Sequence, residues 1–279
     1  MAEPNWFRYL KWRRRVAKAR REIASRTGQG TPHGLPHRLV VSLTSFPPRY
    51  PALVLVLRSL LTQSITPDEV VLWLAEGDET ALPDEIRALE AKGLTIRTCA
   101  DWRSYKKHIP ALLAYPEAAV VTFDDDVYYP RDWLERLVRA SIAHPGEVIA
   151  HRAHRFTLCG GRPAPYLDWP KNIGEAGCGA DIFLTGVHGV LYPPRSLHED
   201  VTREDLFLRL APTADDVWMY WMARMQGTLI RHAGGRTRVI EWPGTQEVSL
   251  KSINRSDHSQ GNDEAIAAMM AHYGLPEPK

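Results

Sequence analysis

Cysteine is scarce in this chain, and its distribution excludes two kinds of structure. The 279 residues include only three cysteines, Cys99, Cys159 and Cys178, and none of them has the Cys-x-x-Cys spacing that is typical of zinc sites. Their small, odd number also argues against a disulfide framework. The sequence therefore favours a reducing compartment, and we expect the protein to be cytoplasmic.

Long apolar runs are also missing. No hydrophobic stretch approaches the roughly 20 residues that a membrane-spanning helix needs, and the first residues lack the pattern of a signal peptide. Hydrophobic residues make up 44% of the chain and charged residues 24%, which is ordinary for a globular protein. Because a chain of this length can bury a large core, we expect one large α/β domain or two small ones.

The net charge of +2 conceals a strongly basic N-terminal segment. Residues 1–22 contain eight lysines and arginines but only two glutamates, a net charge of +6 that leaves −4 for the remainder. Trp6, Phe7 and Leu10 recur at roughly helical spacing, and Trp12 adds another aromatic ring. A basic helix of this kind can lie on an anionic membrane surface, here the inner face of the plasma membrane. A solvated helix or a disordered basic arm is the alternative.

This charge distribution divides the chain into three parts. We predict a basic amphipathic helix over residues 1–25 and, because glycine and proline recur there, a flexible linker over residues 26–37. One domain is expected over residues 38–279. Nucleic acid is not an expected partner, because the basic character does not continue into this domain.

Strands and helices alternate from Arg38 onward. Apolar, β-branched runs predict buried strands, and the segments between them have helical composition. This order predicts an α/β fold with a mostly parallel sheet flanked by helices. The predicted strands are 39–43, 69–74, 94–97 and 119–123, and the predicted helices are 51–63, 84–92, 105–114 and 131–143.

Three consecutive carboxylates follow the last of these strands. Asp124, Asp125 and Asp126 come directly after residues 119–123, and ligands of α/β sheets bind just outside the carboxyl ends of the strands. Adjacent carboxylates repel one another unless a cation neutralises them. Their oxygen atoms suit Mg²⁺ or Mn²⁺, and such an ion can neutralise a diphosphate. A solvated acidic turn is the alternative.

A second acidic pair occurs late in the chain. Asp215 and Asp216 precede an apolar run over residues 217–222 that has helical length, so they mark a helix N-terminus. Aspartate at such a position can satisfy free backbone N–H groups and suits the helix dipole. The pair can also contribute to a functional site, if one carboxylate caps the helix and the other faces that site.

Taken together, these pieces resemble the GT-A glycosyltransferases, specifically the bacterial family-2-like enzymes that build surface polysaccharides. The resemblance covers most of residues 38–272 and rests on the order and spacing of several segments. They are the first strand with its Ser/Thr-Pro loop, Ser104–Lys107, Asp124–Asp126, Thr185–Pro193, Asp215–Trp218 and Gly261–Asp263. The resemblance implies metal-dependent transfer of a sugar, of the hexosyltransferase type, from a nucleotide-diphosphate donor. The expected donor is a UDP-sugar, and the expected acceptor is a capsule or lipopolysaccharide glycan.

The resemblance also implies roles for residues near the expected donor. It places the nucleotide at Thr44, Ser45 and Arg49, whose hydroxyls and guanidinium can hydrogen-bond a base, ribose or phosphate. Asp101 is a further candidate for the base or ribose, and Lys107 for the diphosphate.

A divalent ion, Mn²⁺ or Mg²⁺, is the cofactor that the resemblance implies. The family's Asp-x-Asp pattern makes Asp124 a ribose or metal contact and Asp126 a direct metal ligand. Asp125 is a further candidate for contact with the donor. The direction of its side chain stays open, because alternate residues of an extended segment point to opposite sides. GT-A enzymes often use a residue late in the chain, commonly histidine, as a further metal or phosphate contact. His258 is the preferred candidate for this contact over Asn254 and Asp257.

An inverting transfer needs a general base near the acceptor hydroxyl. The resemblance places the second acidic pair there, with Asp216 as the first choice and Asp215 as a close alternative. Four cationic or titratable residues between the two acid clusters could bind a phosphate-bearing or acidic acceptor. They are His151, Arg152, His154 and Arg155.

Three other classes of protein match the sequence less well. A nucleotidyltransferase of similar fold would need a glycine-rich loop after the first strand, and residues 42–47 contain no glycine. A metal-dependent phosphohydrolase would usually place a nucleophilic aspartate at the position of Thr44. A non-catalytic carbohydrate-binding protein would not need both acid clusters.

Overall fold

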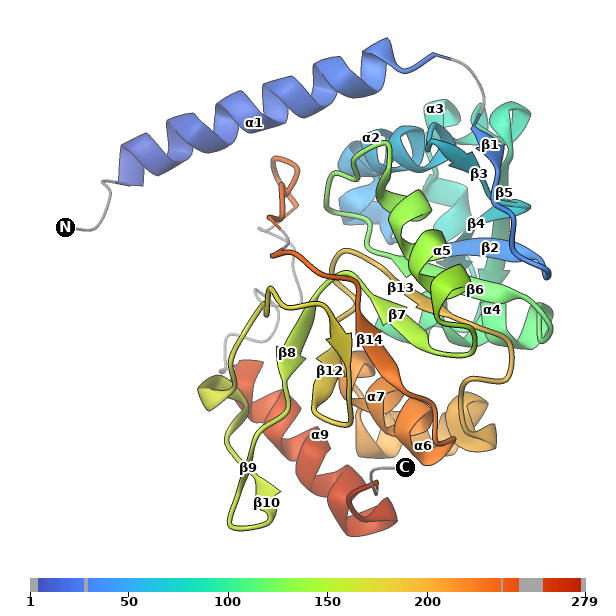
Figure 1. Cartoon of the computed structure of the whole chain (residues 1–279). Coiled ribbons are helices and arrows are strands. Elements are labelled where there is room, and N and C mark those ends of the chain that lie inside the picture. The colour runs from blue at the N-terminus through green and yellow to red at the C-terminus, as the bar shows by residue number, and fades with distance from the viewer. Residues whose placement is uncertain (1–4, 28–29, 237, 246–257, 277–279) are drawn as a thin grey trace.

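A computed structural model describes residues 5–27, 30–236, 238–245 and 258–276 (Figure 1). Its centre is an eight-stranded sheet with the strand order β11-β14-β7-β13-β6-β2-β4-β5. In chain order these strands are β2 (Leu39–Thr44), β4 (Glu69–Ala75), β5 (Leu94–Cys99), β6 (Ala119–Phe123), β7 (Val148–Ala150), β11 (Gly177–Cys178), β13 (Val190–Tyr192) and β14 (Ile230–His232). Three further strand pairs lie outside this sheet: β8 (Ala153–Arg155) with β12 (Ile182–Leu184), β9 (Leu158–Cys159) with β10 (Arg162–Pro163), and β1 (Thr31–Pro32) with β3 (Ile65–Thr66).

The sheet is mixed but mostly parallel. β2 lies between β4 and β6 and is parallel to both, β5 is parallel to β4, and β14 is parallel to β7. β13 runs antiparallel to β6 and β7, and β11 runs antiparallel to β14. The predicted fold class, an α/β sheet flanked by helices, is confirmed, and the four predicted strands correspond to β2, β4, β5 and β6.

Each face of the sheet is covered by its own set of helices, because side chains alternate along the strands. Leu39, Val41 and Leu43 of β2 enter a core shared with α1, α2, α3 and α5, whereas Val40 enters the opposite core. The second face is covered by α4, α6, α7 and α9. The helices are α1 (Asn5–Ser25), α2 (Tyr50–Leu61), α3 (Asp84–Arg87), α4 (Ile109–Ala114), α5 (Trp133–Ala143), α6 (Glu204–Leu210), α7 (Asp215–Met225) and α9 (His258–Tyr273).

The basic N-terminal segment forms α1, which packs on the core from Trp12 onward. The first turns of α1 project away from the sheet in Figure 1. The side chains that α1 buries are Val16, Ala19 and Ile23, and those that it exposes include Trp6, Phe7, Tyr9 and Leu10. No helix within the described ranges is long and apolar enough to cross a membrane.

The segment expected as a linker, residues 26–37, is tied to the domain. Arg26 donates to the backbone carbonyls of Ser59 and Tyr129 at 2.9 and 2.8 Å, which anchors the end of α1. The two-residue strand β1 (Thr31–Pro32) pairs with β3 (Ile65–Thr66). At Gly30 an added Cβ would lie 2.6 Å from the backbone carbon of Ile65, so only glycine permits this close approach.

Candidate active site

The acidic triplet lies directly after β6, beside the end of β2. Because the two strands are parallel and in register, Ser45 and Asp125 leave the sheet at the same edge. The Ser45 hydroxyl donates to Asp125 Oδ2 at 2.6 Å, and Arg49 Nη1 donates to Asp125 Oδ1 at 2.8 Å. Arg49 Nη1 also lies 3.0 Å from Asp126 Oδ2. Arg49 ends the short 3₁₀ helix η1 (Pro47–Arg49), so the Ser/Thr-Pro loop positions this guanidinium.

Lys107 joins the triplet to the late acidic pair. Its Nζ lies 2.8 Å from Asp124 Oδ1 and 3.2 Å from Asp215 Oδ2, and its side chain is only 9% exposed. Lys107 ends the 3₁₀ helix η4 (Arg103–Lys107), and the Ser42 hydroxyl of β2 donates to its backbone carbonyl at 2.7 Å. One buried ammonium group therefore brings the end of β6 and the start of α7 together.

Asp215 and Asp216 occupy the first turn of α7, but their carboxylates bond to other elements. The N-cap residue is Ala214, which makes no side-chain cap. Asp215 Oδ2 lies 3.2 Å from His108 Nε2, and Asp216 Oδ1 accepts the backbone N–H of Gly186 at 2.7 Å. The capping role considered from the sequence is not seen, because within the described residues neither carboxylate accepts from an N–H group of α7. The helix dipole still favours both charges.

The two acids of this pair have opposite proton affinities. Burial opposes ionisation of Asp215, but the ammonium of Lys107 and the hydrogen bond with His108 outweigh it and hold the pKa of Asp215 well below its usual range. Burial and the neighbouring charge of Asp215 raise the pKa of Asp216 to about 7. Asp215 is therefore ionised at neutral pH, whereas Asp216 can gain and lose a proton there. A pKa near the working pH suits a general base.

Among the residues that the structure describes, negative charge is in excess across both acid clusters. Five carboxylates face Lys107 and Arg49, the two permanent cations in the ion pairs that the described residues form there. Burial lowers the pKa of His108, so this ring adds no charge at neutral pH. Burial, followed by the charge of Asp124, raises the pKa of Asp126 to about 7. An additional cation would relieve this excess.

Asp124 and Asp126 fit a divalent ion that is shared with a diphosphate. Their side chains are 19% and 18% exposed, so solvent reaches both, and Asp125 between them points to Ser45 and Arg49 instead. In the part of the chain that the structure covers, no group of three or more His, Cys, Asp or Glu side chains could hold a metal by itself. Mg²⁺ is commonly bound by one or two carboxylates together with substrate phosphates. Asp124 and Asp126 therefore suit an ion that is also bound by substrate phosphates better than an ion bound by protein side chains alone.

The candidates for a late metal contact lie at the edge of what the structure describes. His258 is the first residue of α9, but its side chain is outside the described residues, as are Asn254 and Asp257. Nearby, Asp263 Oδ1 of α9 accepts the backbone N–H of Tyr166 at 2.7 Å. The Gly261–Asp263 segment therefore lies within α9 and links it to the body of the protein.

The other expected donor residues lie along the same edge of the sheet. Thr44 ends β2 next to Ser45, and its hydroxyl donates to the backbone carbonyl of Trp73 at 2.8 Å. Asp101 follows β5, is 66% exposed, and pairs with Lys106 at 2.7 Å. Hydrogen bonding to Lys106 lowers the pKa of Asp101. Neither residue contacts the triplet directly, so the structure separates them from the cluster around Lys107.

Two residues of this cluster are not among the sequence-based candidates. His108 directly follows Lys107 and contacts Asp215. The Tyr129 hydroxyl accepts the backbone N–H of Asp124 at 2.9 Å, which holds the start of the triplet. His108 directly follows the Ser104–Lys107 segment, and Tyr129 lies three residues after the triplet. Their roles nevertheless depend on contacts that spacing alone does not show.

The four residues expected at an acceptor site do not converge. His151 stacks on Trp133 with ring centroids 3.8 Å apart, and Arg152 donates to the Thr185 hydroxyl at 3.2 Å. His154 and Arg155 bond elsewhere, with Asn172 and Asp181 respectively. Each of the four side chains therefore has a different partner, and they do not form one anion site.

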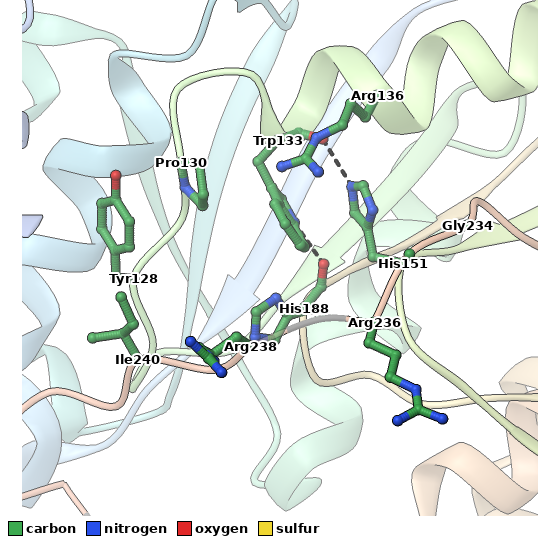
Figure 2. A pocket seen from close by; sticks show the side chains of 11 residues that line it. Tyr128, Pro130, Trp133, Arg136, His151, His188, Gly234, Arg236, Arg238 and Ile240 are labelled. Carbon is green, nitrogen blue, oxygen red and sulfur yellow. Dashed lines mark hydrogen bonds between the residues drawn. The ribbon is translucent and has the colours of Figure 1, made fainter. Parts of the chain in front are cut away.

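A pocket of about 220 Å³ lies close to the acidic triplet, and its lining includes Tyr128, α5 residues and described residues after β14 (Figure 2). Its wall includes His151 from the expected acceptor group and His188, which precedes β13. Figure 2 shows Trp133 next to His151 and His188, and its indole N–H donates to the His188 carbonyl at 2.6 Å. The acid clusters themselves do not line this pocket.

Replacing Lys107 tests whether its ammonium holds the clusters together. We expect Lys107→Met to lower the free energy of unfolding by about 3–5 kcal/mol, because buried carboxylates lose their shared partner. The loss should be larger at pH 8 than at pH 5, where protonated carboxyls need no cation. Lys106→Met is the matched control, since Lys106 is equally buried but pairs with an exposed acid. Equal losses in the two variants, measured by urea denaturation, would contradict the bridging role.

Neither a protein-family model nor a curated protein sequence matches this chain. Three similar solved structures illustrate the structural likeness. A mannosyltransferase from Pyrobaculum calidifontis, in complex with GDP-Man and Mn²⁺, is 19% identical with a TM-score of 0.35, over 51% of this chain and 43% of that chain. The chain therefore spans less than half the length of that protein.

The other two likenesses extend over more of the chain. TarS residues 1–349 from S. aureus is 13% identical with a TM-score of 0.48, over 85% of this chain and 72% of that chain. Glucosyl-3-phosphoglycerate synthase from Mycobacterium tuberculosis, in complex with Mn²⁺, uridine diphosphate and glucosyl-3-phosphoglycerate, is 15% identical with a TM-score of 0.42, over 99% of this chain and 88% of that chain. Because all three TM-scores are below 0.5, these likenesses decide neither the activity nor the ligands of this chain.

Proposed function

We propose that this chain is a nucleotide-sugar glycosyltransferase. The observation that carries the proposal is the contact of one ammonium group, Lys107 Nζ, with Asp124 of the triplet and Asp215 of the late pair. Glycosyl transfer needs a group that neutralises a diphosphate and a base for the acceptor hydroxyl, close to each other. The Lys107 contacts support both requirements. They bring the Asp-x-Asp segment, which suits a cation for the diphosphate, close to the acid pair that contains Asp216, whose pKa is about 7.

The donor is proposed to lie along the carboxyl edge of β2, β4 and β6. A UDP-sugar would meet Thr44, Ser45 and Arg49 with its nucleotide, and Asp101 is a further candidate contact. Its diphosphate would lie near Lys107 and near a Mn²⁺ or Mg²⁺ ion held by Asp124 and Asp126, with His258 as a possible third ligand. The ion would supply positive charge to the leaving diphosphate. Asp125 acts on the donor through Ser45 and Arg49, which its carboxylate holds.

Asp216 is proposed as the general base of an inverting transfer. Its pKa of about 7 allows it to take the proton of an acceptor hydroxyl at neutral pH. The hydroxyl oxygen then forms a bond to the anomeric carbon, and the bond from that carbon to the diphosphate breaks. Asp215, the alternative base, is held as a carboxylate by Lys107 and His108 and instead raises the proton affinity of its neighbour.

A capsule or lipopolysaccharide glycan is the proposed acceptor, reached from an anionic membrane surface. The first half of α1 supports this placement, because Trp6 and Tyr9 are 65% and 55% exposed on a helix whose N-terminal segment carries a charge of +6. Aromatic side chains and basic residues together favour the boundary between lipid headgroups and acyl chains. The second half of α1 stays on the core, so the helix could hold the domain at that surface.

The first test of this function is Asp216→Asn. We expect turnover with a sugar acceptor to fall by about 10² or more while donor affinity stays unchanged, because only the base is removed. In the wild type, kcat/KM should rise with pH through about 7, since Asp216 accepts a proton only when ionised. Asp215→Asn should move this rise to lower pH, because it removes the charge that helps to raise the pKa of Asp216.

Asp205→Asn is the matched control, since Asp205 lies in the first turn of the neighbouring helix α6 but is exposed and pairs with Arg203. Its kinetics should equal those of the wild type. Normal turnover by folded Asp216→Asn would show that the base lies elsewhere.

The second test concerns the metal. Thermal unfolding with and without Mn²⁺ should show that UDP raises the wild-type Tm only when the ion is present. At 100 times Kd, binding contributes about 2.7 kcal/mol, which corresponds to roughly 5–10 °C. Asp126→Asn should lose this gain, and Asp132→Asn, at an exposed acid before α5, should keep it.

Without ligand, the Asp126→Asn variant should be at least as stable as the wild type at pH 8. The raised pKa of Asp126 means that ionisation costs folding free energy, so the wild type loses stability as pH rises from the ordinary pKa of 3.8 to about 7, and the full loss persists at pH 8. An equal UDP-dependent gain in EDTA would remove the metal from the proposal.

The third test concerns α1. Trp6→Ser combined with Phe7→Ser should weaken binding to anionic phosphatidylserine vesicles at least about tenfold, because two apolar side chains no longer insert. Leu167→Ser is the control, since Leu167 is a similarly exposed apolar residue on another element. These substitutions are preferable to deleting residues 1–22, because Val16 and Ala19 belong to the core. Unchanged sedimentation with vesicles would contradict the membrane role.

A further inference from the structure

The pocket beside the acid clusters is strongly basic. Three arginines line it, Arg136 of α5 and Arg236 and Arg238 of the segment after β14, and its wall contains no Asp or Glu. Arg136 has Asp132 as a partner, whereas Arg236 and Arg238 form no ion pair with any residue that the structure describes. A concave site with guanidinium groups and no carboxylate attracts oxyanions.

The backbone after β14 places two of these arginines together. Gly234 and Gly235 both have positive φ angles, +94° and +81°, which L side chains rarely adopt. The chain turns at these glycines, and Arg236 and Arg238 then follow at alternate positions. Both residues line the same pocket. Figure 2 shows the Arg238 guanidinium beside His188, whereas that of Arg236 points away from His188.

His188 provides an independent sign of a ligand in this pocket. It lines the pocket, its side chain is only 2% exposed, and both ring nitrogens are buried without a hydrogen-bond partner among the described residues. It also has a φ of +76°, which is uncommon for a residue other than glycine. Buried polar atoms are nearly always paired in folded proteins, so two unpaired nitrogens on a strained residue indicate a missing partner.

The chemistry of the histidines defines what that partner can offer. Burial lowers the pKa of His188 to about 4 and that of His151 to about 3, so both rings are neutral at pH 7. A neutral imidazole donates from one nitrogen and accepts at the other. A phosphate ester that also carries a hydroxyl can bond to both ring nitrogens. A phosphate oxygen accepts from the ring N–H, and the O–H group donates to the other nitrogen. Guanidinium groups would pair with the phosphate charge.

The pocket adjoins the proposed catalytic base through a short turn. Gly186, two residues before His188, donates its N–H to Asp216 at 2.7 Å, and the Gly189 N–H donates to the Gly186 carbonyl at 2.9 Å. The Cα atoms of residues 186 and 188 are therefore at most about 7 Å apart. The His188 ring that lines the pocket and the Gly186 N–H that binds Asp216 therefore belong to one short turn.

We propose that this pocket binds the phosphate group of a phosphorylated acceptor and thereby positions its hydroxyl near Asp216. This inference rests on the proposed function, since it names the acceptor class of that site. The volume of about 220 Å³ suits a phosphate with a short stem and is below the usual 300–1,000 Å³ of pockets for larger ligands. A complete nucleotide sugar does not fit it, so the donor and this phosphate occupy different places.

The test uses methyl phosphate as the probe and isothermal titration of the full chain, with UDP and Mn²⁺ at saturation. We expect methyl phosphate to bind, and Arg236→Gln combined with Arg238→Gln to weaken it at least about tenfold, because hydrogen bonds to charged groups are lost. His188→Asn should also weaken it, and asparagine tolerates the positive φ. Arg139→Gln is the matched control, since Arg139 is an exposed arginine of α5 outside the pocket.

Three results would overturn the inference. They are equal binding by the double arginine variant, binding of methyl phosphate that occurs without UDP but not with UDP at saturation, and binding of inorganic phosphate without binding of methyl phosphate. The second would assign the pocket to the donor, and the third would leave no room for an esterified group. If His188→Asn does not fold, the arginine variants still decide, because both side chains are exposed. Loss of UDP binding with normal methyl phosphate binding would contradict the proposed function and leave the phosphate site standing.

Discussion

The ion pairs of Lys107 hold together two parts of the chain that the fold would otherwise only bring near each other. Asp124 follows a central strand, and Asp215 begins a helix on the second face of the sheet. Both carboxylates are largely buried, and each would repel the other without the ammonium between them. Lys107 is itself placed by the Ser42 hydroxyl, so β2 determines where the positive charge lies. The positions of the triplet and of the proposed base therefore depend on one buried cation.

This arrangement costs stability at the place where the proposed reaction occurs. The pKa values of Asp126 and Asp216 are both raised to about 7, because burial and a neighbouring carboxylate oppose their ionisation. A protein selected only for stability would replace carboxylates whose ionisation costs folding free energy. Their retention in one cluster matches a site that receives a cation at Asp126 and a proton at Asp216. Clusters of perturbed carboxylates of this kind are concentrated at functional sites.

The turn before β13 connects the two sides of the site. Gly186 contacts Asp216, and His188, two residues later, lines the basic pocket. Gly189 has a positive φ, and an added Cβ there would lie 3.1 Å from the Phe123 ring of β6, so glycine permits the turn to approach the strand that carries the triplet. The acid clusters suit a cation and a diphosphate, and the pocket suits a separate anion. Opposite electrostatic characters thus lie within a few residues of each other.

The sequence alone determined the local elements, and tertiary structure determined which charges meet. Hydrophobic patterning was sufficient to predict β2, β4, β5 and β6 and the position of the triplet after β6, because strand composition and chain order are local properties. The same patterning placed Asp215 and Asp216 at a helix start, but it left capping open, and the carboxylates instead bond to Lys107, His108 and Gly186.

The partners of Lys107 and the pocket at His188 could not be predicted from spacing. Lys107 meets Asp124 and Asp215 across 17 and 108 residues of chain, and His188 joins Arg236 and Arg238 only where β13, β14 and α5 come together. Packing also separates four residues that follow one strand in the sequence. They are His151, Arg152, His154 and Arg155, and each bonds to a different partner. Contacts between distant segments are decided by how the sheet and its helices pack, since a local pattern carries no information about which side chains that packing brings into reach.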